Sequence, residues 1–109
     1  MERRKKAAEE VRLALLERAL AALKGLSQRI PFSKAYVFGS LARPGAFMQE
    51  ISDADIAFEG LRIEDFFRTA AFLSAELGLD VDVVRLEDVA GSLLEAKIKR
   101  EGILWTPER

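Results

Sequence analysis

The 109-residue sequence contains no cysteine, no histidine and no asparagine. Without cysteine there is no disulfide bond and no thiolate metal site. Without histidine there is no imidazole base and no Ser-His or Cys-His catalytic pair, and most zinc sites are excluded as well. Any metal site must therefore use oxygen ligands, which favour hard ions such as Mg2+ or Mn2+.

Charge and hydropathy exclude further classes of protein. The 17 basic and 18 acidic residues leave a net charge of -1, so no general attraction to nucleic acid or to an anionic membrane is expected. The apolar runs are too short to span a bilayer and no secretory signal is visible, so we expect a cytoplasmic protein. The length predicts a single domain, residues 1–109, with one core.

The first third of the chain has the pattern of one long helix, predicted from residue 2 to residue 23 with Gly25 as its C-cap. It carries two apolar stripes, which suggests that both sides are buried. One stripe would cover the sheet and the other would bind a partner, unless both form a single wide apolar face. The stripes are Leu13, Leu16, Leu20, Leu23 and Val11, Leu15, Ala19, Ala22, Leu26.

The rest of the chain alternates between strand and helix patterns. Strands are predicted at residues 34–38, 54–58 and 80–86, with a short edge strand at 103–105 and a loop at 46–52. Helices are predicted at 63–77, capped by Gly78, and from residue 87 or 88 to about residue 100. The buried face of the helix at 63–77 is predicted to comprise Ile63, Phe66, Phe67, Ala70, Ser74 and Leu77.

Paired aspartates open the second predicted strand. Residues i and i+2 of a strand point to the same face, so Asp53 and Asp55 present two close carboxylates, which favours a cation between them. The alternative is local turn chemistry. In the third strand Asp82 shares a face with Asp80 and lies between valines, so we expect Asp82 rather than Asp80 to reach the same site if the two strands are neighbours.

A Gly-Ser turn follows the first strand. Gly39 permits a tight turn and a close approach of phosphate to backbone N–H groups, and the Ser40 hydroxyl can donate to a phosphate oxygen. Arg43, one helical turn later, can reach the same anion. The turn alone is weak evidence, and its spacing to Asp53 and Asp55 gives it weight.

Together, Gly39-Ser40, Ala42-Arg43, Asp53-x-Asp55 and Asp82 resemble the minimal nucleotidyltransferases of the DNA polymerase beta-like superfamily. The resemblance implies an α+β palm with a short mixed sheet and helices packed on it. It implies that Gly39 and Ser40 hold a nucleoside triphosphate such as ATP, and that Asp53, Asp55 and Asp82 hold two divalent metals. Pro44 departs from the family pattern, which often has glycine directly after the arginine, and this leaves the role of Arg43 open.

This chain resembles the small members of the family, which look like antitoxins of HEPN-type ribonuclease toxins. The resemblance implies transfer of AMP from ATP to a hydroxyl on a helical partner protein, with Asp53, Asp55 and Asp82 as the catalytic carboxylates. The alternative is a non-catalytic antitoxin that neutralises its partner by occlusion. Either role agrees with a spare apolar stripe on the first helix, which could also serve self-association.

Overall fold

The computed structural model describes residues 2–45 and 53–107. The second range contains both strands that were predicted to carry the site aspartates. A four-stranded mixed sheet has the order β3-β2-β1-β4, with β2 antiparallel to β1 and parallel to β3, and β4 antiparallel to β1. The predicted palm-like α+β fold is confirmed. The strands are β1 (Lys34–Phe38), β2 (Ala54–Glu59), β3 (Val81–Arg85) and β4 (Ile103–Trp105).

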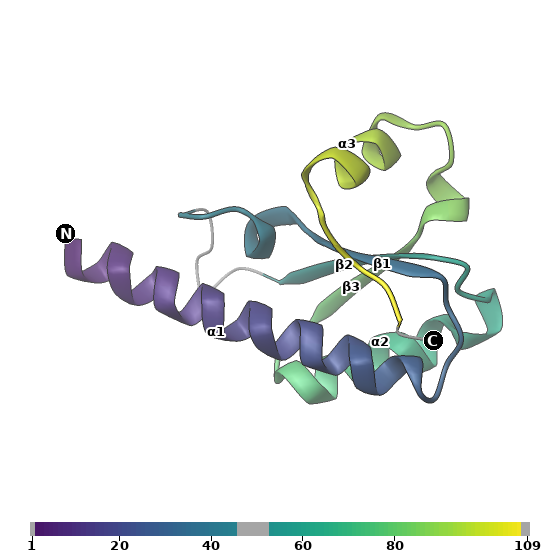
Figure 1. Ribbon diagram of the computed structural model, residues 1–109, viewed down its shortest axis with the longest axis horizontal. Coiled ribbons are helices and arrows are strands. Elements are labelled where there is room, and N and C mark those ends of the chain that lie inside the picture. Colours follow the sequence, from purple (N-terminus) through teal and green to yellow (C-terminus); the bar gives the residue numbers. More distant parts are fainter. Residues whose placement is uncertain (1, 46–52, 108–109) are drawn as a thin grey trace.

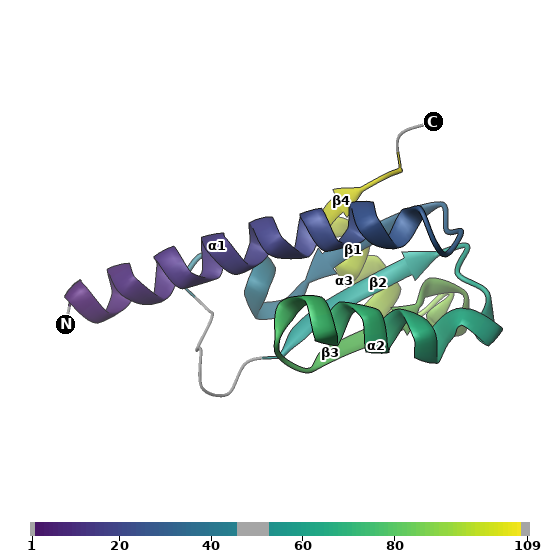
Figure 2. The same ribbon diagram turned by 90° about the horizontal axis from the view of Figure 1, so that it is seen from below.

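Helices cover both faces of this sheet. The long helix α1 (Glu2–Ser27) and α2 (Phe66–Leu77) lie on one face, and α3 (Leu93–Glu101) lies on the other (Figure 1). The N-terminal half of α1 extends beyond the strands, which Figure 2 shows from a second direction. Nowhere in the described ranges is a helix both long enough and apolar enough to cross a bilayer.

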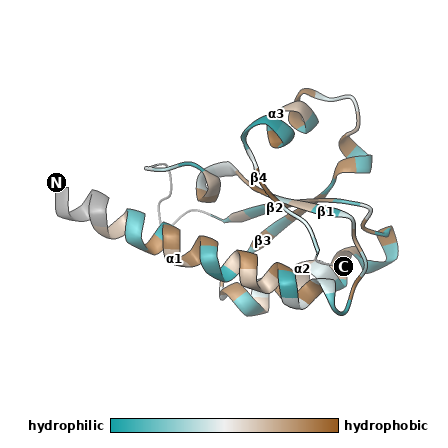
Figure 3. Cartoon of the chain, viewed as in Figure 1, coloured by the Kyte–Doolittle hydropathy of each residue, from teal (hydrophilic) through white to brown (hydrophobic). Residues whose placement is uncertain are grey.

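Side-chain alternation along the strands divides the core in two. Ile56 and Phe58 point with Ala54 into the larger cluster under α1 and α2. Ala57 points the other way, into a smaller cluster under α3 that includes Ile98. Hydrophobic and hydrophilic bands alternate along α1, as expected for a helix with one face on a sheet (Figure 3).

Helix α1 does not end at Gly25, as the sequence predicted, but continues to Ser27. Gly25 instead faces α2, where the Phe72 ring would lie 3.6 Å from a Cβ atom at this position. The chain turns only after Ser27, where the backbone N–H groups of Arg29 and Ile30 both donate to the carbonyl of Leu26. Packing against α2 therefore explains this glycine better than helix capping does.

The two apolar stripes predicted on α1 are not separated as expected. Leu23 is fully buried in the core, while Leu13 in the same stripe is 48% exposed. Leu16 and Leu20 are partly buried and pack against the core cluster. Leu13 is exposed because it lies off the packed side of α1, where its neighbours Arg12 and Leu15 are buried.

The predicted buried face of the helix at 63–77 is wrong at its N-terminal end. Ile63 is 70% exposed and Phe67 is 82% exposed. Residues Ile63–Asp65 form a 3-10 turn, and the α-helix starts only at Phe66, which changes the helical phase. The buried positions are Thr69, Leu73 and Leu77, and Gly78 is the predicted cap, with a left-handed φ of 69°.

The last helix begins later than predicted. Residues Leu86–Val89 form a 3-10 turn, and α3 starts at Leu93. Ser92 is the N-cap, because its hydroxyl accepts from the backbone N–H of Glu95 at 3.1 Å while the Glu95 carboxylate accepts from the N–H of Gly91 at 3.0 Å. The edge strand β4 is confirmed, whereas the loop predicted at residues 46–52 lies outside the described residues.

Candidate active site

Two of the predicted carboxylates face each other across neighbouring strands. The parallel pairing of β2 with β3 places Asp55 directly beside Asp82. Both residues share the sheet face that carries Ala57 and Val84, which α3 covers further along. Asp80 precedes β3, and its backbone carbonyl accepts from the N–H of Ala54. The structure thus brings Asp82, rather than Asp80, beside Asp55.

The environment of Asp55 opposes its ionisation. Burial raises the pKa of its carboxyl, and the negative charges of Asp82 and then Asp53 raise this pKa further. The side chain is half-buried, so water screens these charges incompletely. A cation at this position would remove the repulsion, and carboxylate oxygens are ligands that Mg2+ and Mn2+ prefer.

Asp53 is exposed and lies immediately before β2. Its charge is close enough to Asp55 to affect that residue's pKa. Across residues 2–45 and 53–107, however, no three acidic side chains converge closely enough to form a ready-made metal site. The pair of Asp55 and Asp82 is therefore the arranged part of the site, and the three-carboxylate metal set stays a prediction.

Gly39 occupies the turn next to this pair. Phe38 pairs with Asp55 across β1 and β2, so the turn starts directly beside the Asp55 carboxylate. Gly39 has a φ of +72°, and a Cβ atom there would lie 3.3 Å from the Asp55 carboxyl carbon and overlap one of its oxygens. Only glycine suits both the backbone conformation and the space.

The rest of the predicted turn lies at the surface. Residues Gly39–Ala42 form a 3-10 turn in which the backbone N–H of Arg43 donates to the Ser40 carbonyl at 3.3 Å. Ser40 is half-buried, and Arg43 is exposed. Leu41 is fully buried, which attaches the turn to the core while its polar residues stay accessible.

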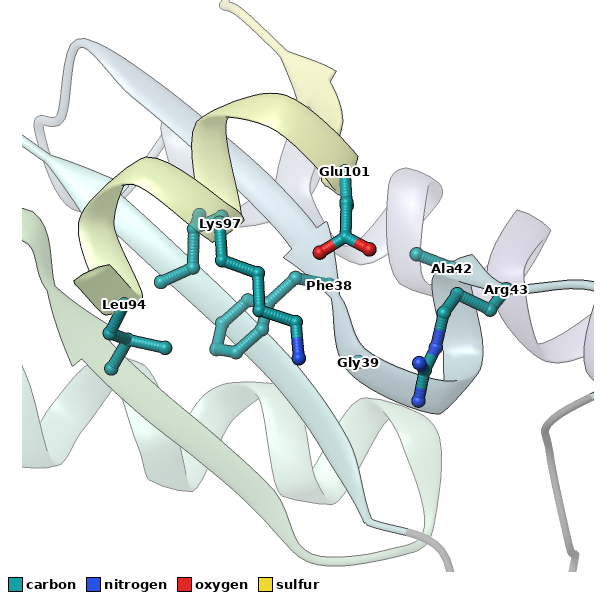
Figure 4. A pocket seen from close by; sticks show the side chains of 8 residues that line it. Phe38, Gly39, Ala42, Arg43, Leu94, Lys97 and Glu101 are labelled. Atoms are coloured by element: carbon teal, nitrogen blue, oxygen red, sulfur yellow. The ribbon is translucent and has the colours of Figure 1, made fainter.

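A pocket of about 130 Å3 opens between this turn and α3. In Figure 4 the Lys97 side chain extends from α3 toward Gly39, and the Arg43 side chain lies on the other side of the turn. Phe38 and Leu94 add apolar lining, and Glu101 lies at the rim. Sequence reasoning missed Lys97, because no local pattern connects it to a turn more than 50 residues earlier.

Comparison with known proteins finds similar folds among solved structures. No family model matches the chain, and no curated protein matches it. Among solved structures, the antitoxin-containing complex "MntA-HpeT" aligns with a TM-score of 0.65 at 26% identity, over 79% of this chain and 71% of that chain. A complex of a tri-AMPylated Shewanella oneidensis HEPN toxin with its MNT antitoxin aligns with a TM-score of 0.63 at 26% identity, over 84% and 72%.

A third structure is described as a minimal nucleotidyltransferase. It aligns with a TM-score of 0.64 at 31% identity, and the alignment covers 84% of this chain and 93% of that one. The match thus includes nearly the whole of the relative as well as most of this chain. On this evidence the chain belongs to the minimal nucleotidyltransferase family.

Proposed function

We propose that this protein transfers a nucleoside monophosphate, AMP from ATP, to a hydroxyl on a partner protein, as the antitoxin of a HEPN-type toxin. The hydroxyl oxygen bonds to the α-phosphorus of ATP as the bond from that phosphorus to the β-phosphate oxygen breaks, and pyrophosphate leaves. The observation that carries the proposal is the placement of Gly39 against Asp55, with Asp82 beside Asp55 on the next strand. A phosphate-sized turn adjoining paired carboxylates is what phosphoryl transfer requires for positioning and charge stabilisation.

Asp53, Asp55 and Asp82 are the residues that would hold Mg2+ or Mn2+. When bound, such ions neutralise triphosphate charge and stabilise the leaving group. The raised pKa of Asp55 supports a cation site, because two uncompensated carboxylates side by side are unfavourable. Asp82 is the more exposed of the pair, so its carboxylate is better placed to accept the proton of an incoming hydroxyl.

The turn would orient the triphosphate. Backbone N–H groups after Gly39 and the Ser40 hydroxyl are donors for phosphate oxygens. Lys97 and Arg43 flank the turn and would add positive charge on either side of the phosphate chain (Figure 4). Phe38 and Leu94 give the same pocket an apolar wall that suits the flat face of a nucleoside.

The partner is proposed from the relatives. One of the similar structures contains a HEPN toxin that is tri-AMPylated and bound to an MNT antitoxin. Leu13, which is 48% exposed near the middle of α1, offers apolar surface to such a partner.

The proposal is tested by incubating the protein with radiolabelled ATP, Mg2+ and a HEPN-type toxin, and following label on the toxin. Wild type should label it, and Asp55→Asn should reduce the rate by about 100-fold or more. Asp80→Asn is the matched control, since it removes a nearby exposed carboxylate outside the pair and should leave labelling intact. Equal labelling by wild type and Asp55→Asn excludes the catalytic role. Tight toxin binding without labelling by wild type identifies a non-catalytic antitoxin instead.

A further inference from the structure

Glu9 and Arg12 form an ion pair on α1 that bonds to the Gly-Ser turn and to the segment just after it. Neither residue lies in the predicted motifs. The Arg12 guanidinium donates to the Leu41 carbonyl at 2.8 Å. It also donates to both carboxylate oxygens of Glu9, at 2.9 and 2.7 Å. Glu9 in turn accepts from the backbone N–H of Gly45 at 3.0 Å. The pair therefore bonds to the backbone at both ends of residues 41–45.

Arg12 differs from the other paired arginines of the described chain in its burial. Its side chain is 5% exposed, against 16% or more for the arginines of the other ion pairs. A buried guanidinium is tolerated only when its donors are satisfied, and here the carboxylate fork and the Leu41 carbonyl do so. An ordinary exposed i,i+3 pair would contribute little and would adopt no single geometry.

Hydrogen bonding favours the charged form of both Glu9 and Arg12 over the neutral form. The hydrogen bonds from Arg12, and then that from the Gly45 N–H, lower the pKa of Glu9 to about 2. The hydrogen bond between Arg12 and Glu9 raises the pKa of Arg12. Both groups are thus ionised throughout the neutral range, and the bonds to the turn are charge-assisted, which makes them stronger than neutral ones.

We infer that Glu9 and Arg12 are positioning residues for nucleotide binding, which set the Gly-Ser turn at the distance from Asp55 that the triphosphate needs. The inference rests on the proposed function. The turn between β1 and β2 is at the surface, so its backbone N–H groups would otherwise sample several orientations. Leu41 fastens the turn to the core by its side chain, and Arg12 fastens the carbonyl of the same residue.

The test uses the full chain, alone for amide exchange and nucleotide titration and with a HEPN-type toxin for the kinetics. Amide hydrogen exchange measures the order of residues 39–45 in the nucleotide-free protein. Titration with MgATP and with a non-hydrolysable analogue measures the affinity for nucleotide. Kinetics with a HEPN-type toxin measure KM and kcat. The variants are Glu9→Gln, Arg12→Gln and the conservative Arg12→Lys.

Matched controls lie on the same helix. Glu10→Gln makes the same chemical change at an exposed neighbouring position. Arg18→Gln removes an arginine that also donates to a backbone carbonyl, that of Glu76, at a distance from the turn. Melting temperature and circular dichroism identify any variant that has lost its fold, and Glu9→Gln, whose side chain is partly exposed, should remain folded even if Arg12→Gln does not.

We expect exchange at Gly45 to be about tenfold faster in Glu9→Gln and Arg12→Gln, because a charge-assisted bond is lost. MgATP affinity should fall and KM should rise by about 10- to 100-fold, with kcat little changed, since a misplaced turn impairs binding geometry. Arg12→Lys should recover part of both, and the controls should match wild type.

Unchanged exchange across residues 39–45 overturns the inference, because the pair would then not order the turn. Faster exchange with unchanged MgATP affinity and KM also overturns it, because the pair would then be only a structural link. If wild type binds no MgATP, the proposed function fails and the positioning role fails with it. MgATP binding and toxin labelling by wild type separate that case from one in which the function holds but the pair is irrelevant.

Discussion

Gly39 lies directly against the carboxylate of Asp55, close enough that a methyl group on Gly39 would overlap it. The contact joins the turn after β1 to the second residue of β2, which are neighbours in the sheet through the pairing of Phe38 with Asp55. One backbone turn and one carboxylate thus share a single small space, and substitution at either position alters the other.

Gly39→Ala should therefore both strain the backbone of the turn and displace the Asp55 carboxylate. A left-handed φ in alanine carries strain of about 1–3 kcal/mol, and the Asp55 carboxylate must also move. We expect loss of stability in that range together with loss of MgATP binding, measured by urea denaturation and calorimetric titration. Gly78→Ala is the control, since its φ of +69° gives comparable strain but a Cβ there has no neighbour within 4 Å. If both variants bind MgATP equally well, the contact with Asp55 is irrelevant to binding.

Asp55→Asn should stabilise the metal-free protein near neutral pH. Because the folded pKa of Asp55 is raised above its ordinary value of 3.8, its stability contribution is greatest below pH 3.8 and is lost as pH rises through the raised value. Removing that charge should therefore stabilise the fold at neutral pH. Thermal melts should also show that Mn2+ stabilises wild type but not Asp55→Asn. An equal Mn2+ response in both would argue against Asp55 as a ligand.

Glu9→Gln should change how stability depends on acid. The folded pKa of Glu9 is about 2, below its ordinary value of 4.5, so its contribution is present above pH 4.5 and disappears as pH falls through about 2. The wild-type free energy of unfolding should therefore fall more steeply than that of Glu9→Gln between these values, and the two should converge below pH 2. Chemical denaturation at a series of pH values measures this, with Glu10→Gln as the control. Parallel curves for wild type and Glu9→Gln would contradict it.

Thr69→Val should stabilise the fold. The Thr69 hydroxyl is fully buried on α2 and has no hydrogen-bond partner among the residues described. Replacing an unsatisfied buried hydroxyl by a methyl group removes its desolvation penalty, which is about 1 kcal/mol. Urea denaturation provides the measurement. Thr69→Ser, which keeps the hydroxyl and loses the methyl group, should destabilise by about 1 kcal/mol. A loss of stability in Thr69→Val would mean that the hydroxyl is satisfied in solution.

Charges placed on α1 should separate partner binding from folding. Leu23 is fully buried, so Leu23→Glu should destabilise by about 3 kcal/mol or more by burying an unpaired charge. Leu13 is half exposed, so Leu13→Glu should change stability by less than about 0.5 kcal/mol while weakening binding to a HEPN-type toxin. Thermal melts and calorimetric titration measure the two effects. Unchanged toxin binding by Leu13→Glu would place the partner elsewhere on the molecule.

The placement of the candidate site residues in the sheet was predictable from the sequence, because it depends on local periodicity. In the structure Ile56 and Phe58 lie in the core on the sheet face opposite to that of Asp55, as alternation along a strand requires. The same rule placed Asp82 on a common face with Val84, and a glycine after an apolar strand predicted the turn at Gly39. Only the assumption that the second and third strands are neighbours was needed to bring Asp55 beside Asp82, and the parallel pairing confirms it.

Helix phase was less predictable than strand alternation. A three-residue 3-10 turn before α2 changed which side chains face the sheet, so Phe67 is exposed and Thr69 is buried. Glycine was also ambiguous, since Gly25 and Gly78 look alike in sequence but only Gly78 caps a helix. In both cases the outcome depends on what packs against the helix, which no local pattern contains.

The strands, the faces of their aspartates and the glycine turn follow from periods of two residues and from backbone conformation, so they could be predicted from the sequence. The order of the strands, the burial of Arg12 on a carbonyl 29 residues away and the approach of Lys97 to the same turn arise only when the chain folds. From the sequence alone, charged side chains on helices are predicted to be solvent-exposed. Their roles depend on desolvation and on partners from distant segments, and these exist only once the helices have packed on the sheet.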